Sequence, residues 1–216
     1  MARADGGPYR WTPLFSLAYA RHDPEVGRDA VLDTANALLE HGADPNSGYL
    51  WHGLPTPFTV LTGIFGEGEG GPSRQPRHPH SQAFARLLLE NGADPNDGQA
   101  LYNRMFEPGN DHLELLFEFG LGTGDGGPWR ARLRDAVDAP AALVQGQLQW
   151  AVVHAMRERV ELLGDRPVVE QLLSLGADPD VRDQRFDATP LGWARYFDHP
   201  DLAELLAPVT TPVQDE

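Results

Sequence analysis

A nine-residue pattern occurs three times in this chain, at residues 38–46, 88–96 and 172–180. Each copy contains two leucines, two variable residues and Gly-Ala-Asp-Pro, and ends in Asn or Asp. Paired leucines are typical of the last turn of an amphipathic helix, and the glycine lets the chain leave that helix in a left-handed conformation. Asp-Pro favours a turn, because Asp bonds to nearby backbone and Pro cannot continue a helix. We therefore predict a protein built from repeated helix-and-turn units.

A second pattern marks where helices begin. Thr12-Pro13, Thr56-Pro57 and Thr189-Pro190 each place a good helix-capping residue directly before a proline suited to the first helical position. Together the two patterns resemble the ankyrin repeat family, whose unit runs Thr-Pro-Leu, short helix, turn, second helix, Leu-Leu-x-x-Gly-Ala-Asp and a finger-like hairpin. The resemblance implies an all-α fold, an ankyrin-repeat solenoid of stacked antiparallel helix pairs with finger hairpins or loops.

The register of these patterns predicts a single ankyrin-repeat domain, residues 1–216, with five units. The units are expected at residues 9–46, 50–96, 98–122, 140–180 and 186–208. Gln99 stands where the third unit would have its capping threonine. Two insertions interrupt the repeats, at residues 67–81 and 124–140. The first insertion is rich in Gly, Glu, Pro and His, so we expect a loop that buries little apolar surface and adds little to stability.

The composition excludes several kinds of partner and site. The chain has 216 residues and a formal net charge of −15, and a surface of that sign repels nucleic acid. It has no cysteine, which excludes disulfides and thiolate chemistry. Neither the apolar core of a signal peptide nor the ~18 consecutive apolar residues of a membrane span is present. We therefore expect a cytoplasmic protein with no nucleic-acid or membrane partner.

Histidines are the strongest candidates for chemistry. His78 and His80 are two residues apart, with His52 and His112 elsewhere in the chain. Imidazole is the commonest transition-metal ligand, but a metal site needs three or four ligands that converge, which an exposed proline-rich loop rarely provides. The chain also lacks the motifs of serine hydrolases, zinc peptidases and nucleotide-binding loops. We predict no catalytic residue, no metal site and no cofactor.

The family resemblance also indicates which side chains face a partner. In an ankyrin stack, the concave surface is lined by the residues just before each Thr-Pro and by the pair eight and nine positions after the threonine. These positions, with one aromatic residue of the first finger, predict partner contacts at Trp11, Arg21, Trp51, Ile64, Phe65, Glu107, Phe186, Phe197 and Asp198. Four of these residues are apolar, whereas a surface that binds no partner would be polar at these positions, and this predicts a hydrophobic patch. The four are Ile64, Phe65, Phe186 and Phe197.

The sequence thus predicts a protein–protein interaction module that is monomeric when free and binds a partner protein through its concave face and finger loops. One alternative is an enzyme or small-ligand-binding protein whose pocket forms where the insertions close over the groove, with the four histidines and a carboxylate converging in it. Another is a structural or regulatory subunit of a larger complex, with an apolar end face at residues 205–208. A basic run at residues 130–134 is interpreted as a solvated helix face, with contact to an acidic partner or to a phosphate as its alternative.

Overall fold

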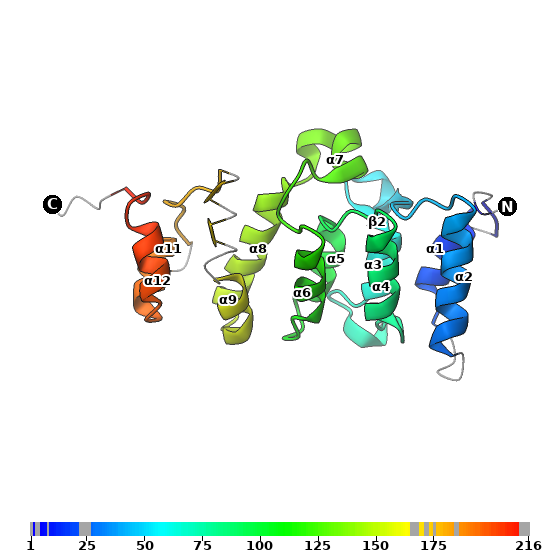
Figure 1. Ribbon diagram of the computed structural model, residues 1–216, viewed down its shortest axis with the longest axis horizontal. Helices are drawn as coiled ribbons and strands as arrows, with labels where there is room; N and C mark the ends of the chain where they lie inside the picture. Colours follow the sequence, from blue (N-terminus) through cyan, green and yellow to red (C-terminus); the bar gives the residue numbers. More distant parts are fainter. Residues whose placement is uncertain are drawn as a thin grey trace. The chain divides into compact units, whose positions relative to one another are not determined.

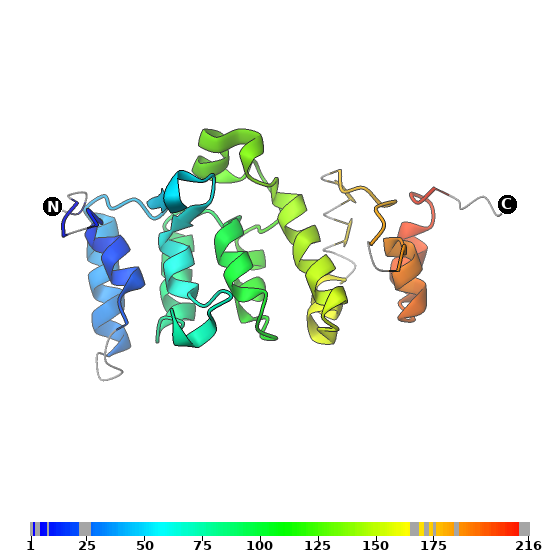
Figure 2. The same cartoon turned by 180° about the vertical axis from the view of Figure 1, so that it is seen from behind.

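The computed structural model describes residues 2, 5–7, 9–21, 27–164, 169–170, 173–174, 176–183 and 186–211. The chain divides into two compact parts, an N-terminal lobe of residues 1–143 and a C-terminal lobe of residues 144–216. Most of the described secondary structure is helical, as predicted (Figures 1 and 2). Within the described residues, no helix is long and apolar enough to cross a membrane.

The N-terminal lobe contains two rows of helices. The first row is α1 (Pro13–Tyr19), α3 (Val60–Phe65) and α5 (Gly98–Arg104), and the second row is α2 (Arg28–Glu40), α4 (Ser81–Glu90) and α6 (Asp111–Glu118). In the first row, α1 packs on α3 and α3 packs on α5. In the second row, α2 packs on α4 and α4 packs on α6. Figure 1 shows the two rows as two layers, each layer formed by every other helix in the sequence.

Shorter elements connect and cover these helices. They are β1 (Gly48–Leu50), the 3-10 turn η1 (Trp51–Gly53), β2 (Pro57–Thr59), η2 (Gly71–Ser73), α7 (Gly127–Leu133), η3 (Arg134–Ala136) and the start of α8 (Pro140–Val153). The two strands pair antiparallel, with Tyr49 opposite Phe58. This hairpin lies between the first two helix pairs, where the sequence predicts a finger. We call residues 48–59 the first finger.

The core of the N-terminal lobe is centred on α3, of which all six residues are buried. Its packing on α1 needs a glycine, because the ring of Tyr19 occupies the place that a Cβ on Gly63 would take. Ile64 and Phe65 are both fully buried. The prediction that these two residues line an exposed binding face is therefore wrong.

The reason for that error lies in where α3 begins. Thr56 and Pro57 do not start the helix: Pro57 is the first residue of β2, and the N-cap is Thr59. The Thr59 hydroxyl accepts a hydrogen bond from the Thr62 N–H, and the Thr62 hydroxyl accepts one from the Thr59 N–H. This capping box satisfies two N–H groups at the start of the helix. The helix thus starts three residues later than predicted, and the positions counted from Thr56 fall in the core.

The start of α5 also differs from the prediction. Its N-cap is Asp97 rather than Gln99, and the buried Asp97 carboxylate accepts from the Ala100 N–H at 2.9 Å. The same carboxylate accepts hydrogen bonds from the hydroxyls of Thr59 and Thr62. One side chain therefore joins the N-termini of two adjacent helices. At α1 and at α11 (Pro190–Tyr196), the predicted caps Thr12 and Thr189 are confirmed.

The glycine turns of the nine-residue pattern are confirmed. Gly42, Gly92 and Gly176 have φ angles of 86°, 89° and 87°, in the left-handed region that favours glycine. In each copy the aspartate that follows accepts a hydrogen bond from the N–H two residues further on, at 2.8 to 3.0 Å. These bonds fold the Asp-Pro segment into a tight turn.

The asparagine that ends each of the first two copies connects one helix pair to the next. Asn46 donates to the Gly92 carbonyl and accepts from the Asp94 N–H, both at 2.8 Å. In the same way, Asn96 accepts from the Gly122 N–H at 2.8 Å and donates to the Thr123 carbonyl at 3.1 Å. Each asparagine therefore satisfies one donor and one acceptor of the following turn.

The first insertion is not the loosely attached loop that its composition predicts. Its backbone is tied to the helices by bonds from the Gly68 N–H to the Asn103 carbonyl and from the His78 N–H to the Ile64 carbonyl. His78 is only 1% exposed and its ring packs on Phe84. The expectation of a segment that packs little is therefore wrong at His78, whereas its contribution to stability stays a prediction.

A buried ion network joins this insertion to α5 and α6. The Arg104 side chain is 3% exposed and pairs with the buried Glu67 carboxylate. Arg104 also lies 3.5 Å from the carboxylate of Asp111, which accepts hydrogen bonds from Arg77 and Gln82. Hydrogen bonding by His112 and Arg77 holds the pKa of Asp111 well below its usual range, so this carboxylate stays ionised.

The C-terminal lobe contains the rest of α8, α9 (Arg157–Leu163), α11 and α12 (Pro200–Leu206). α11 packs on α12 around a core of Leu191, Ala194, Leu202 and Leu206. The third nine-residue pattern ends in Asp180 in place of asparagine, and its carboxylate accepts from the Thr211 N–H at 2.7 Å. Leu172, at the start of that pattern, lies outside the described residues. The predicted unit at 140–180 is therefore described only in part.

Leu88 provides a test of the core. It belongs to the second nine-residue pattern and is fully buried on α4. We expect Leu88→Ala to lower the free energy of unfolding by about 2–5 kcal/mol, because it empties a packed site. Leu54→Ala, at a leucine that is 56% exposed, should leave that free energy almost unchanged. Urea denaturation of both variants gives the comparison, and similar small losses in the two would contradict the packing described for α4.

Arg104 provides a test of the ion network. We expect Arg104→Met to cost about 3–5 kcal/mol of unfolding free energy, because it leaves the buried Glu67 carboxylate without its cation. The matched control is Arg86→Met, which breaks an exposed pair with Glu118 and should change stability little. Denaturant titrations measure both effects. If Arg104→Met were as mild as the control, the first insertion would not be anchored through this pair.

Candidate functional site

A group of aromatic side chains lies where α1 meets the first finger. Tyr9, Trp11, Phe15, Tyr49 and Trp51 line a cavity of about 480 Å³. We call this site the aromatic cleft. The remaining residues that line it are Arg10, Thr12, Ser47, Gly48, Leu50 and His52.

The rings of the cleft form a continuous series of contacts. Trp11 lies 6.3 Å from Tyr49 and 4.9 Å from Phe15, measured between ring centroids. Phe58 continues the series, at 5.7 Å from Tyr49 and 5.1 Å from Trp51. The strand pairing explains part of this order, because Tyr49 and Phe58 are opposite each other in the hairpin. Flat rings held by their neighbours in this way form a rigid surface.

Two members of the series are open to solvent. Tyr9 is 74% exposed and Trp51 is 45% exposed, whereas Trp11 is half-buried and Phe15 is buried. Burial raises the pKa of Tyr49, so its phenol stays protonated at neutral pH. The cleft therefore presents apolar ring faces with polar N–H and O–H groups at their edges.

The structure brings together two of the predicted contact residues, Trp11 and Trp51. It also adds Tyr49 and Phe58, which the prediction missed. A signal for them exists in the sequence: Tyr9 and Trp11, and again Tyr49 and Trp51, are two residues apart, the spacing that puts side chains on one face of an extended segment.

Arg21 has a structural role that the sequence did not indicate. Its guanidinium donates to the carbonyls of Ala18, Ala20, Gly63 and Pro76. It thereby connects the end of α1 to α3 and to the first insertion. Burial lowers the pKa of Arg21 to about 10, so the group is still charged at neutral pH.

None of the other predicted contact residues lines the cleft. Glu107 is half-buried in the turn between α5 and α6, where its charge acts on Arg104. In the C-terminal lobe, Phe186 and Phe197 are 56% and 46% exposed and both contact the ring of Trp193. Asp198 is exposed directly after Phe197, with a positive φ of 58°.

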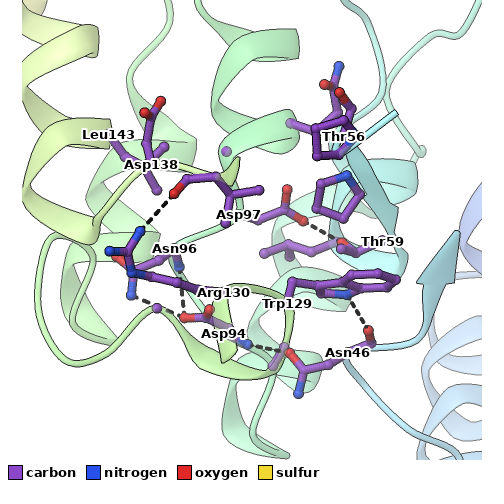
Figure 3. A pocket seen from close by; sticks show the side chains of 18 of the residues that line it. Asn46, Thr56, Thr59, Asp94, Asn96, Asp97, Trp129, Arg130, Asp138 and Leu143 are labelled. Carbon is purple, nitrogen blue, oxygen red and sulfur yellow. Dashed lines mark hydrogen bonds between the residues drawn. The ribbon is translucent and has the colours of Figure 1, made fainter. Parts of the chain in front are cut away.

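The second insertion covers a separate cavity of about 230 Å³ (Figure 3). Helix α7 forms one wall, and the Trp129 indole N–H anchors it by donating to the Asn46 carbonyl at 2.9 Å. The buried Asp97 carboxylate lines the same cavity, and burial raises its pKa. Arg130 also lines it and donates to the Val137 carbonyl at 2.7 Å. The second insertion, residues 124–140, thus contributes to the lining of this cavity, and the first insertion, residues 67–81, does not.

The four histidines do not converge as the enzyme alternative requires. His52 lines the aromatic cleft, near the finger that precedes α3. His78 and His112 are buried near the opposite end of α3, against Ile64 and Phe65. In the part of the chain that the structure describes, no group of three or more His, Asp or Glu side chains is arranged to hold a metal ion.

Comparisons with protein-family models, with curated proteins and with solved structures found no match to this chain. The functional interpretation therefore depends on the residues of this chain and on their geometry.

Proposed function

We propose that this chain is an ankyrin-repeat protein that binds a partner protein through the aromatic cleft. The two rows of helices, the hairpin between the first two pairs and the Gly-Ala-Asp-Pro turns all support the family assignment. Stacked helix pairs generate an extended surface whose side chains are free to specify a partner. In this proposal the protein acts without catalysis or a cofactor and is monomeric when free.

The observation that carries the proposal is the exposure of Tyr9 and Trp51 at the ends of a rigid series of rings. Aromatic side chains on a surface leave apolar area in contact with water, and burying that area against a partner is favourable. Such anchors are also enriched among the few residues that contribute most of the binding energy at interfaces. A structural role alone would not require either ring to be open to solvent.

The C-terminal lobe repeats part of this arrangement. Phe186 stands three residues before the cap of α11, as Tyr9 stands three before the cap of α1. Tyr196, seven residues after its cap and 77% exposed, corresponds to Tyr19. The same positions of two units thus carry aromatic residues. We include Phe186, Tyr196 and Phe197 in the proposed binding surface, as a second contact region on their own lobe.

The proposal predicts that binding is lost when the exposed rings are removed. We expect the double variant Tyr9→Ala with Trp51→Ala to bind its partner at least about tenfold more weakly, since two aromatic anchors commonly contribute ~2 kcal/mol or more each. The assay is quantitative capture from a lysate of the source cells with the full chain immobilised. Each captured protein is compared between the wild type and the variant.

The matched control is Tyr102→Ala, at a tyrosine that is 39% exposed on α5 and belongs to neither aromatic region. It should capture the same proteins as the wild type. If the double variant Tyr9→Ala with Trp51→Ala also captured the same proteins in the same amounts as the wild type, the cleft would not be the binding surface.

A further inference from the structure

We propose that the occupant of the aromatic cleft is a proline-rich segment of the partner, bound as an extended left-handed polyproline helix. This inference rests on the proposed binding function and names the chemistry of the ligand. It follows from the charge of the cleft, from the hydrogen-bonding groups at its edges and from the flat aromatic rings that form its wall.

The cleft is close to electrically neutral, which is unusual in a chain with a net charge of −15. No carboxylate is found among its lining residues, so a basic segment would find no ion-pair partner there. Its one arginine, Arg10, is paired with Asp5 at 2.9 Å. An acidic segment would therefore compete with Asp5 for this arginine, and it would be repelled by the net charge of the chain. The complementary occupant is uncharged.

The polar groups at the ring edges are mainly donors. The indole N–H groups of Trp11 and Trp51 donate to no other described residue, and an indole has no acceptor. The phenol of Tyr49 stays protonated, so it too can donate. The best occupant therefore offers many acceptors and few donors. A run of prolines does this, because each residue has a carbonyl and none has an N–H.

The flat rings of the cleft suit the same ligand. Tyr9 and Trp11 are 5.3 Å apart, Trp11 and Tyr49 are 6.3 Å apart, and Tyr49 and Trp51 are 6.4 Å apart, so the rings contact one another and form a continuous aromatic wall. A polyproline helix has three residues per turn, and its pyrrolidine rings form apolar ridges along the helix. Such a ridge can lie against the aromatic faces of the wall. Because both surfaces are already rigid, little conformational entropy is lost on binding, and aromatic grooves are known to recognise such helices.

The test is calorimetric titration of the full chain with a capped octaproline peptide and with a capped Gly-Ser peptide of equal length. We expect saturable binding of octaproline only. Trp51→Ala should weaken that binding by about tenfold or more, as should Tyr9→Ala, whereas Tyr102→Ala should leave it within about twofold. Circular dichroism melts check that each variant is folded. The two cleft variants are independent of each other, so a folding defect in one leaves the other informative.

Two results would overturn the inference. The cleft is not a polyproline site if octaproline does not bind the wild-type chain. It is also not one if octaproline binds Trp51→Ala and Tyr9→Ala as tightly as it binds the wild type. Selection of random peptides on the wild-type chain separates this failure from that of the proposed function. If the selected peptides lack proline but bind Trp51→Ala more weakly than the wild type, the proposed ligand class is wrong and the cleft is still the binding surface. If the selected peptides bind the cleft variants as tightly as the wild type, both the ligand class and the cleft are wrong.

Discussion

The structure of the N-terminal lobe depends on hydrogen bonds between successive turns. Turns expose backbone groups that helices cannot satisfy, and a buried or half-buried group without a partner is costly. Asn46 and Asn96 solve this problem in the same way, since each supplies one acceptor and one donor to the following turn. A side-chain amide carries the acceptor and the donor on two separate atoms, so it can bond to two backbone groups of the turn at once. This explains why the nine-residue pattern ends in asparagine where another turn follows it, and it sets the spacing of the helix pairs.

The first finger and helix α7 are both attached to these turns. The first finger begins two residues after Asn46, and the Ser47 carbonyl accepts from the N–H of Val60 at the start of α3. The backbone of Asn46 also accepts the hydrogen bond that anchors Trp129 of α7. A binding surface gains affinity when its rings are held in place before the partner arrives. The turns provide that rigidity, and Asp97 adds to it by joining the caps of α3 and α5.

The parts of the fold that were predictable from sequence are those set by short-range chemistry. The caps Thr12 and Thr189 and the turn at Gly92 needed only a few neighbouring residues. The start of α3 was not predictable in this way, because Thr59 is selected over Thr56 by strand pairing and by Asp97, 38 residues away. The first insertion was misjudged for a similar reason, since a polar composition does not reveal that Glu67 meets a buried arginine. In the aromatic cleft, Trp11 and Trp51 were predicted, but their contact through Tyr49 is a tertiary arrangement.

Amide hydrogen exchange, measured by nuclear magnetic resonance, tests the role of the two asparagines most directly. The amides to follow are those of Asp94 and Gly122, which donate to Asn46 and Asn96 respectively. Asn46→Ala should accelerate exchange at Asp94 and leave Gly122 protected, and Asn96→Ala should do the reverse. If neither variant changed exchange at its own target amide, other contacts would hold the turns, and the asparagines would not be what links one helix pair to the next.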